Sequence, residues 1–167
     1  VSRQVRIRID FVGRDLTNAL TRTSDFIPES FDRLYRAMVV NYVPQGGGTK
    51  SGGPQVGLGT WLVICPNIAG VTSRLQPLMD WRQREGYTVK LATTAETGTT
   101  ANQIKTYIQN AYNTWSPPLE YVAFAGDADQ PYAIPTFFEN ISGYGGEGDH
   151  PYSLLAGEDV LSDIHLG

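Results

Sequence analysis

Carboxylates are concentrated near the C-terminal end of this chain, and their spacing could support metal binding. Asp127 and Asp129 directly follow an apolar stretch that is typical of a buried strand. Asp159, Leu161 and Asp163 occur at every second position, so an extended segment would present two carboxylates and the carbonyl between them. Hard oxygen ligands of this kind suit calcium rather than zinc. A solvated acidic loop explains the same residues equally well, so the residues alone leave both interpretations open.

Three other groups could in principle do chemistry. Cys65 lies within an apolar run without a cationic neighbour, so we interpret it as a packing residue rather than a nucleophile. His150 and His165 lack the spacing of a metal motif. Residues 143–148 match G-x-G-x-x-G, but Asp149 follows them, and an acidic residue there would repel phosphate. We therefore expect a flexible loop at 143–148, with nucleotide binding as a weak alternative.

The charge distribution restricts the class of partner. The net charge is −4, yet the last 49 residues carry nine carboxylates and no Lys or Arg. A face that binds phosphates should be basic, so the composition argues against a nucleic-acid role. No apolar run approaches the ~20 residues of a membrane helix. A single cysteine excludes an internal disulfide framework.

The elements that must position these residues alternate between strand and helix. Apolar runs and helical spacing predict strands at 61–65, 87–92 and 121–125, and helices over 73–85 and from residue 101 to about 115. Such a βαβαβ order predicts a parallel sheet with helices packed on it. The residues expected to delimit the helices are Ser73 and Thr100 as N-caps, Pro77 in a first turn, Gly86 as a stop and Pro117 as a terminator.

The two ends of the chain have a different pattern. Alternating apolar residues predict a strand at 5–9, with a possible partner strand at 37–43. A Gly-rich stretch over 46–54 is typical of a linker. After Gly126 the sequence is rich in turns, and we expect only short strands at 152–155 and 164–166.

Several segments, in order, resemble the gingipain-type cysteine peptidases of family C25. The opening strand 61–66 is followed by Asp80-Trp81-Arg82 and Gly86-Tyr87, which resemble the D-W-K-x-x-x-G region of those domains. The similarity continues through 100–104, 120–127 and 149–152, and it closes with 156–167.

The resemblance implies a caspase-like or flavodoxin-like α/β fold, of which this chain holds the first subdomain. Residues 60–167 would form that subdomain, 46–59 a Gly-rich linker, and 1–45 the terminal strands of a preceding β-rich domain. The family's catalytic histidine and cysteine would lie downstream, in a second subdomain that partners this one and handles the protein or peptide substrate. We therefore assign no catalytic residue in this chain and expect it to be inactive alone.

The resemblance also implies a structural calcium ion. The family's ligands fall on three carboxylates and two backbone carbonyls, which are those of Asp127, Ala156, Asp159, Leu161 and Asp163. Family members are typically secreted or cell-surface bacterial proteins, so we expect that location here. The alternative is a stand-alone α/β module that binds calcium or a small ligand and has no peptidase activity.

Overall fold

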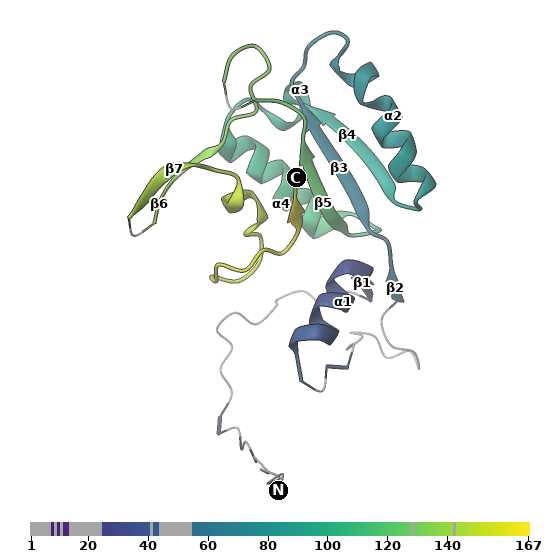
Figure 1. Cartoon of the computed structure of the whole chain (residues 1–167), viewed down its shortest axis with the longest axis vertical. Coiled ribbons are helices and arrows are strands. Elements are labelled where there is room, and N and C mark those ends of the chain that lie inside the picture. The colour runs from purple at the N-terminus through teal and green to yellow at the C-terminus, as the bar shows by residue number, and fades with distance from the viewer. Residues whose placement is uncertain are drawn as a thin grey trace, which may run out of the picture.

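The computed structural model of the chain describes residues 8, 10, 12–13, 25–40, 42–43, 55–127, 129–141 and 143–167. Its elements, in chain order, are β1 (Phe26–Pro28), α1 (Glu29–Met38), β2 (Gln55–Gly57), β3 (Thr60–Cys65), α2 (Val71–Arg84), β4 (Thr88–Thr93), α3 (Thr94–Thr97), α4 (Ala101–Thr114), β5 (Leu119–Phe124), β6 (Phe137–Ile141), β7 (Tyr144–Gly148), the 3-10 helix η1 (His150–Ser153) and β8 (His165–Leu166). Figure 1 shows their arrangement.

A four-stranded parallel sheet, in the order β4-β3-β5-β8, forms the centre of the molecule. β3 pairs in parallel with β4 on one side and with β5 on the other, and β8 extends the sheet beyond β5. All six residues of β3 are buried, as expected for a central strand with helices on both faces of its sheet. The predicted fold class, a βαβαβ parallel sheet flanked by helices, is confirmed.

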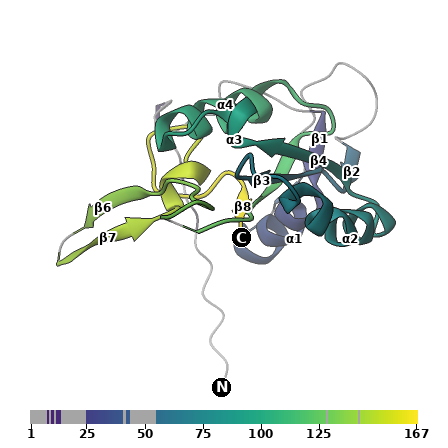
Figure 2. The same cartoon turned by 90° about the horizontal axis from the view of Figure 1, so that it is seen from above.

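Helix α4 covers one face of this sheet (Figure 2). Thr100 caps the helix as predicted, because its Oγ1 accepts the N–H of Gln103 while the Gln103 side chain accepts the N–H of Thr100. This reciprocal capping box satisfies two backbone donors at the start of the helix. Ile104 and Ile108 are then fully buried in the main hydrophobic cluster, together with Ile64 of β3.

Helix α2 lies against the opposite face of the sheet (Figure 2). The Arg82 guanidinium lies 5.3 Å from the centroid of the Trp61 ring of β3, which places Trp61 on this face. No residue of α2 is buried. The two faces therefore differ, because α4 is packed into the core and α2 leaves much of its surface exposed to solvent.

The start of α2 differs from the prediction. The helix begins at Val71, with Gly70 at the N-cap in the left-handed conformation, so the predicted start at Ser73 is wrong. The Ser73 hydroxyl donates to the Gly70 carbonyl at 3.0 Å and caps no backbone N–H. The earlier start also places Pro77 inside the helix instead of in its first turn. The predicted stop is correct, since Gly86 follows the helix with φ +103°.

A helix occupies part of the N-terminal region that the sequence analysis assigns to strands. Residues 29–38 form α1, and the predicted strand over 37–43 is therefore wrong. The i,i+4 ion pair between Asp32 Oδ2 and Arg36 Nε, at 2.7 Å, stabilises the helical conformation. The predicted strand at 5–9 lies outside the described residues except for Arg8.

Two short strands contact α1 in the structure. β1 pairs in parallel with β2, so that Ile27 is opposite Val56. β2 falls within the stretch 46–59 that was predicted to be a linker, whereas residues 46–54 lie outside the described part.

The segment after β5 contains more regular structure than predicted. β6 and β7 form an antiparallel hairpin, so the flexible loop expected at 143–148 is wrong for the residues of β7. The glycine-rich strand β7 is weak by itself, and pairing with β6 holds it in the extended conformation. Residues 150–153 form η1, which replaces the strand expected at 152–155. The strand expected at 164–166 is confirmed as β8. Within the described residues, no helix has the length and apolar character needed to cross a membrane.

Candidate functional site

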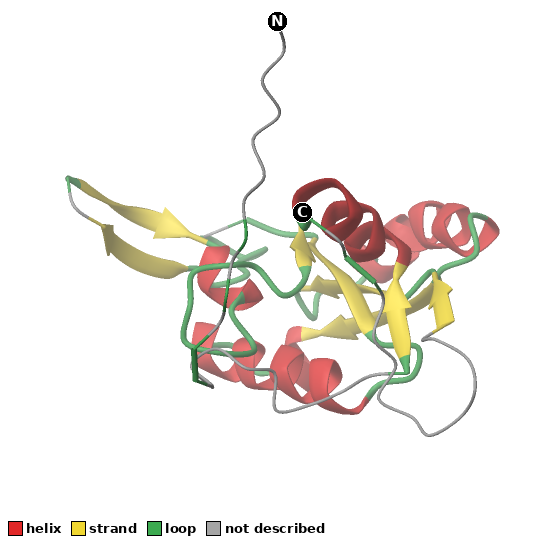
Figure 3. Cartoon of the chain, turned by 90° about the horizontal axis from the view of Figure 1, so that it is seen from below, coloured by secondary structure: helices red, strands yellow, loops and turns green. Residues whose placement is uncertain are grey.

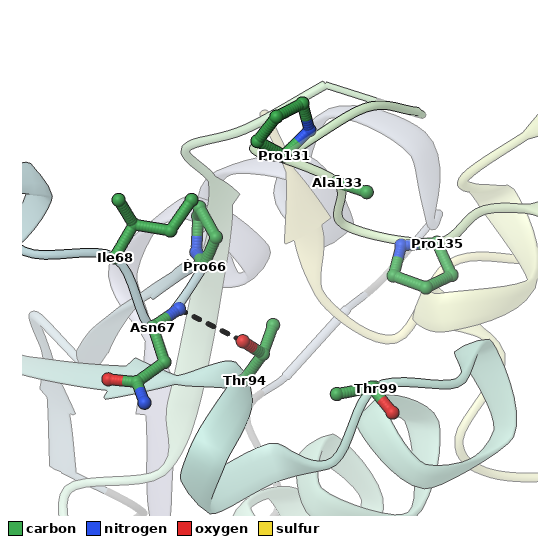
Figure 4. Close-up of a pocket in the computed structure, with 8 residues that line it drawn as sticks. All are labelled: Pro66, Asn67, Ile68, Thr94, Thr99, Pro131, Ala133 and Pro135. Atoms are coloured by element: carbon green, nitrogen blue, oxygen red, sulfur yellow. Dashed lines mark hydrogen bonds between the residues drawn. The ribbon is translucent and has the colours of Figure 1, made fainter.

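The loops at the carboxyl ends of β3, β4 and β5 meet around a shallow pocket of about 280 Å³. Ligands of open α/β sheets bind at this end of the strands. The pocket is lined by residues of these three loops: Pro66, Asn67, Ile68, Thr94, Thr99, Pro131, Ala133 and Pro135. Figure 4 shows the backbone N–H of Asn67 donating to Thr94 Oγ1, a bond of 3.0 Å. The lining carries no charged side chain.

Asp127 lies just beyond the end of β5, as predicted. Its backbone N–H donates to the carbonyl of Tyr132 at 3.0 Å, and its carbonyl accepts the N–H of Ile134 at 2.7 Å. The chain turns back tightly here, because a Cβ on Gly126 would lie 2.6 Å from the Tyr132 carbonyl oxygen. A glycine is therefore required before Asp127, and Asp127 and Asp129 are both exposed.

The other predicted calcium ligands lie in one loop between η1 and β8. Asp163 Oδ2 accepts the backbone N–H groups of Leu155 and Ala156, at 2.7 and 2.8 Å. Asp159 Oδ1 accepts the N–H of Leu161 at 2.8 Å. The structure thus brings Asp163 to Ala156 and Asp159 to Leu161, and each carboxylate stabilises a turn of the loop.

The predicted ligand set is not gathered around one point in this structure. Among the residues that the structure describes, no three Asp, Glu, His or Cys side chains are close enough to hold a metal ion. The chemistry of the donors, three carboxylates and two carbonyls, fits calcium. Asp163 already uses one oxygen for two backbone N–H groups, and the calcium site stays a prediction.

Cys65 occupies the last position of β3 and is fully buried. Burial raises the pKa of its thiol, and the negative charge of Glu96 raises it further. Since the thiolate is the reactive form, these effects suppress nucleophilic chemistry at neutral pH. The interpretation of Cys65 as a packing residue agrees with this position.

Both histidines make contacts with groups other than Cys65. His150 Nε2 lies 3.1 Å from the carbonyl oxygen of Val160, and its Nδ1 lies 3.8 Å from Glu139 Oε1. His150 therefore links the β6–β7 hairpin to the loop that precedes β8.

His165 belongs to a contact between α1 and the sheet. Its ring stacks between Phe31 of α1 and Tyr121 of β5, with centroid distances of 4.8 and 4.7 Å. Its Nε2 lies 3.0 Å from the hydroxyl oxygen of Ser30. Burial lowers the pKa of His165, and the nearby charge of Glu120 partly opposes this effect.

The centre of this contact is the fully buried carboxylate of Glu120, which no sequence motif predicted. Ser30 Oγ donates to its Oε1 at 2.5 Å, and the backbone N–H of Gly59 donates to its Oε2 at 2.7 Å. A Cβ on Gly59 would lie 2.8 Å from Glu120 Cβ, so this approach requires a glycine. The available signal was a lone carboxylate in an otherwise apolar strand, which must find donors if it is buried.

Residues 59–167 match the family model described as Peptidase family C25. The match includes the whole parallel sheet and the loop between η1 and β8, called the acidic loop below. No curated protein and no solved structure matches the chain significantly.

Proposed function

The chain belongs to peptidase family C25, and from this premise we propose that it is the N-terminal, non-catalytic subdomain of a cysteine endopeptidase. The family match over 59–167 is the observation that carries the proposal. The catalytic histidine and cysteine would come from a downstream subdomain of the same polypeptide.

The positions of the chain's own candidate groups support this division of labour. Cys65 is fully buried, with a raised thiol pKa. His150 contacts a backbone carbonyl, and His165 is stacked between two rings. A nucleophilic thiol must instead be partly exposed and near a cationic group or a base. The uncharged pocket gives no separate support to a calcium- or anion-binding module.

In the complete enzyme, the downstream thiolate would attack the carbonyl carbon of the scissile bond, and the downstream histidine would transfer a proton to the leaving amine. The contribution of this chain would be a rigid support. Its parallel sheet, buried against α4, would hold the strand ends and their loops in place beside the catalytic subdomain. Precise placement of reacting groups is a large component of catalysis.

Peptide hydrolysis tests the proposal directly. We expect the 167-residue chain to leave a mixed fluorogenic peptide library intact. The chain extended by its downstream coding sequence should hydrolyse peptides, lose activity on alkylation with iodoacetamide, and keep activity when Cys65→Ala is introduced. Hydrolysis by the short chain that disappears in Cys65→Ala would contradict the proposal, as would an extended protein without peptidase activity.

The proposal includes a structural calcium ion and export from a bacterial cell. The carboxylates of Asp127, Asp159 and Asp163 and the carbonyls of Ala156 and Leu161 would hold the ion, and it would join the end of β5 to the acidic loop. The high carboxylate content of residues 119–167, with no Lys or Arg, supports cation binding. Export is proposed from the resemblance, and fractionation of the source cells would test it.

Thermal unfolding tests the calcium site. Binding to the folded state alone adds stability, about 2.7 kcal/mol when calcium exceeds Kd a hundredfold. We expect a higher Tm in calcium than in chelator for the unmodified chain, and a smaller difference for Asp127→Ala and Asp159→Ala. Asp129→Ala is the matched control, since it removes an exposed carboxylate from the same strand end without removing a proposed ligand. Equal Tm values in both buffers for the unmodified chain would exclude the site.

A further inference from the structure

β8 is a strand of only two residues, His165–Leu166, at the edge of the central sheet. Backbone hydrogen bonds join its end to β5: the N–H of Phe124 donates to the carbonyl of Gly167 at 2.8 Å, and the N–H of Gly167 donates to the carbonyl of Val122 at 3.0 Å. So short a strand gains little stability from pairing alone. The position of β8 must therefore depend on the side chains that pack on its two faces.

The two faces of β8 pack against different parts of the molecule. Side chains alternate across a strand, and on the α4 side Ile164 is fully buried in the main hydrophobic cluster while Leu166 packs against that cluster. On the opposite side, the His165 ring stacks between Tyr121 of β5 and Phe31 of α1. Figures 2 and 3 show α1 beside this strand. The main cluster supports one face of β8, and α1 supports the other.

A single hydroxyl group joins α1 to both β5 and β8. Ser30 Oγ donates to Glu120 Oε1 at 2.5 Å, and it lies 3.0 Å from His165 Nε2. A hydroxyl has one proton, and Ser30 gives it to Glu120, so Nε2 of His165 must be the donor of the second bond. These directional bonds fix the rotation of the imidazole ring, which the stacking of flat rings alone does not fix.

α1 lies outside the family match, which begins at residue 59. It nevertheless contacts the last strand of the matched region. In the proposed enzyme, the chain continues from β8 into the catalytic subdomain, so the position of β8 determines where that subdomain begins. A segment that precedes the peptidase region therefore packs on the strand that leads to the catalytic groups.

We propose that Ser30 and Phe31 are positioning residues for peptide hydrolysis. Through His165 they hold β8 in the sheet, and β8 in turn orients the catalytic subdomain that follows it. The proposal rests on the proposed function, because it gives α1 a part in the same reaction. Neither residue touches the substrate, and both act through the alignment of the reacting groups, on which a large part of the rate depends.

Amide hydrogen exchange on the 167-residue chain tests the first step without any peptidase activity. Phe31→Ala should speed exchange of the Phe124 and Gly167 N–H groups about tenfold, as expected for the loss of one aromatic stacking contact. Exchange in the central strand β3 should change much less. Ser30→Ala should have a similar local effect, and Ser30→Thr, which keeps the hydroxyl, should restore slow exchange. Leu34→Ala is the matched control, because Leu34 lies on the same helix and is 42% exposed.

Peptidase kinetics on the chain extended by its downstream coding sequence test the second step. We expect Phe31→Ala to lower kcat about tenfold with little change in KM, because it disturbs the alignment of the catalytic groups more than the binding of the peptide. Ser30→Thr should retain more activity than Ser30→Ala. Leu34→Ala should hydrolyse peptides like the unmodified protein.

Three outcomes would overturn the proposal. The first is exchange that in Phe31→Ala is unchanged at Phe124 and Gly167, or is accelerated equally throughout β3, which would make α1 a general stabiliser of the fold. The second is an active extended protein whose kcat is the same with and without Phe31→Ala, a result that leaves the proposed function intact. The third is a higher kcat in Phe31→Ala, which would mean that α1 restrains the enzyme.

Discussion

The α4 face of the sheet and the segment between β5 and β8 contain different kinds of contact. On the α4 face, Leu62, Ile64, Ile104 and Ile108 are all fully buried and contribute no polar side-chain group. Between β5 and β8, the chain contributes Ile134, Tyr152, Leu155 and Ile164 to the same hydrophobic cluster. It adds polar contacts, such as those of Asp163 with two backbone N–H groups and of His150 with a backbone carbonyl. Tyr152, Ser153 and Ile164 of this second region are fully buried.

The difference between the two regions shows how a segment rich in carboxylates can be ordered. A carboxylate loses favourable hydration when it is buried, so it must accept hydrogen bonds or stay exposed. Asp163 accepts two backbone N–H groups, whereas Asp127 and Asp129 stay exposed. Burial of apolar area therefore stabilises the sheet, and directional polar contacts determine the shape of the acidic loop.

The largest expected effect is on the apolar side of the comparison. Ile108→Ala removes a fully buried side chain from the cluster between α4 and the sheet, and it should reduce the free energy of unfolding by about 2–5 kcal/mol. Urea denaturation measures this as a lower midpoint with an unchanged m-value. A loss under ~1 kcal/mol would mean that the cluster contributes less than its burial indicates.

An intermediate effect is expected in the acidic loop. Asp163→Ala leaves the N–H groups of Leu155 and Ala156 without their acceptor, which should cost about 1.5–3 kcal/mol. The measurement is made in chelator, so that calcium makes no contribution, and amide hydrogen exchange should increase locally at those two residues. Unchanged stability and exchange would mean that these hydrogen bonds do not hold the loop in solution.

The smallest effect is expected for Val160, a largely exposed side chain of the same loop. Val160 is 75% exposed, and Val160→Ala keeps the backbone carbonyl that His150 contacts. The free energy of unfolding should therefore change by no more than about 0.5 kcal/mol. A larger loss in urea denaturation would show that Val160 packs against the loop in solution and would weaken the contrast with the sheet.

The periodic patterns of the sequence were sufficient for the central sheet. The continuous apolar run at 61–65 predicts a buried strand, and β3 is fully buried. Thr100 predicts the start of α4, because an N-cap depends only on residues within one helical turn. The gingipain-type resemblance was visible over the same stretch, and the family match covers residues 59–167.

Other features depend on contacts between residues far apart in the sequence. The strand predicted at 37–43 is replaced by the end of α1, whose Phe31 stacks on His165. β7 is glycine-rich and has little strand propensity, but β6 pairs with it residue by residue. Propensity is a weak signal, and tertiary contacts routinely override it.

The sequence by itself determined the order of strands and helices from β3 to β5, because apolar periodicity and capping residues act over short distances. Its motifs, taken in order, carried the resemblance to the family. The burial of Glu120 between Ser30 and Gly59 was decided only by the tertiary structure. No local pattern encodes that site, because its partners are 90 and 61 residues away in the chain. A buried carboxylate is stable only where the fold brings such donors to it.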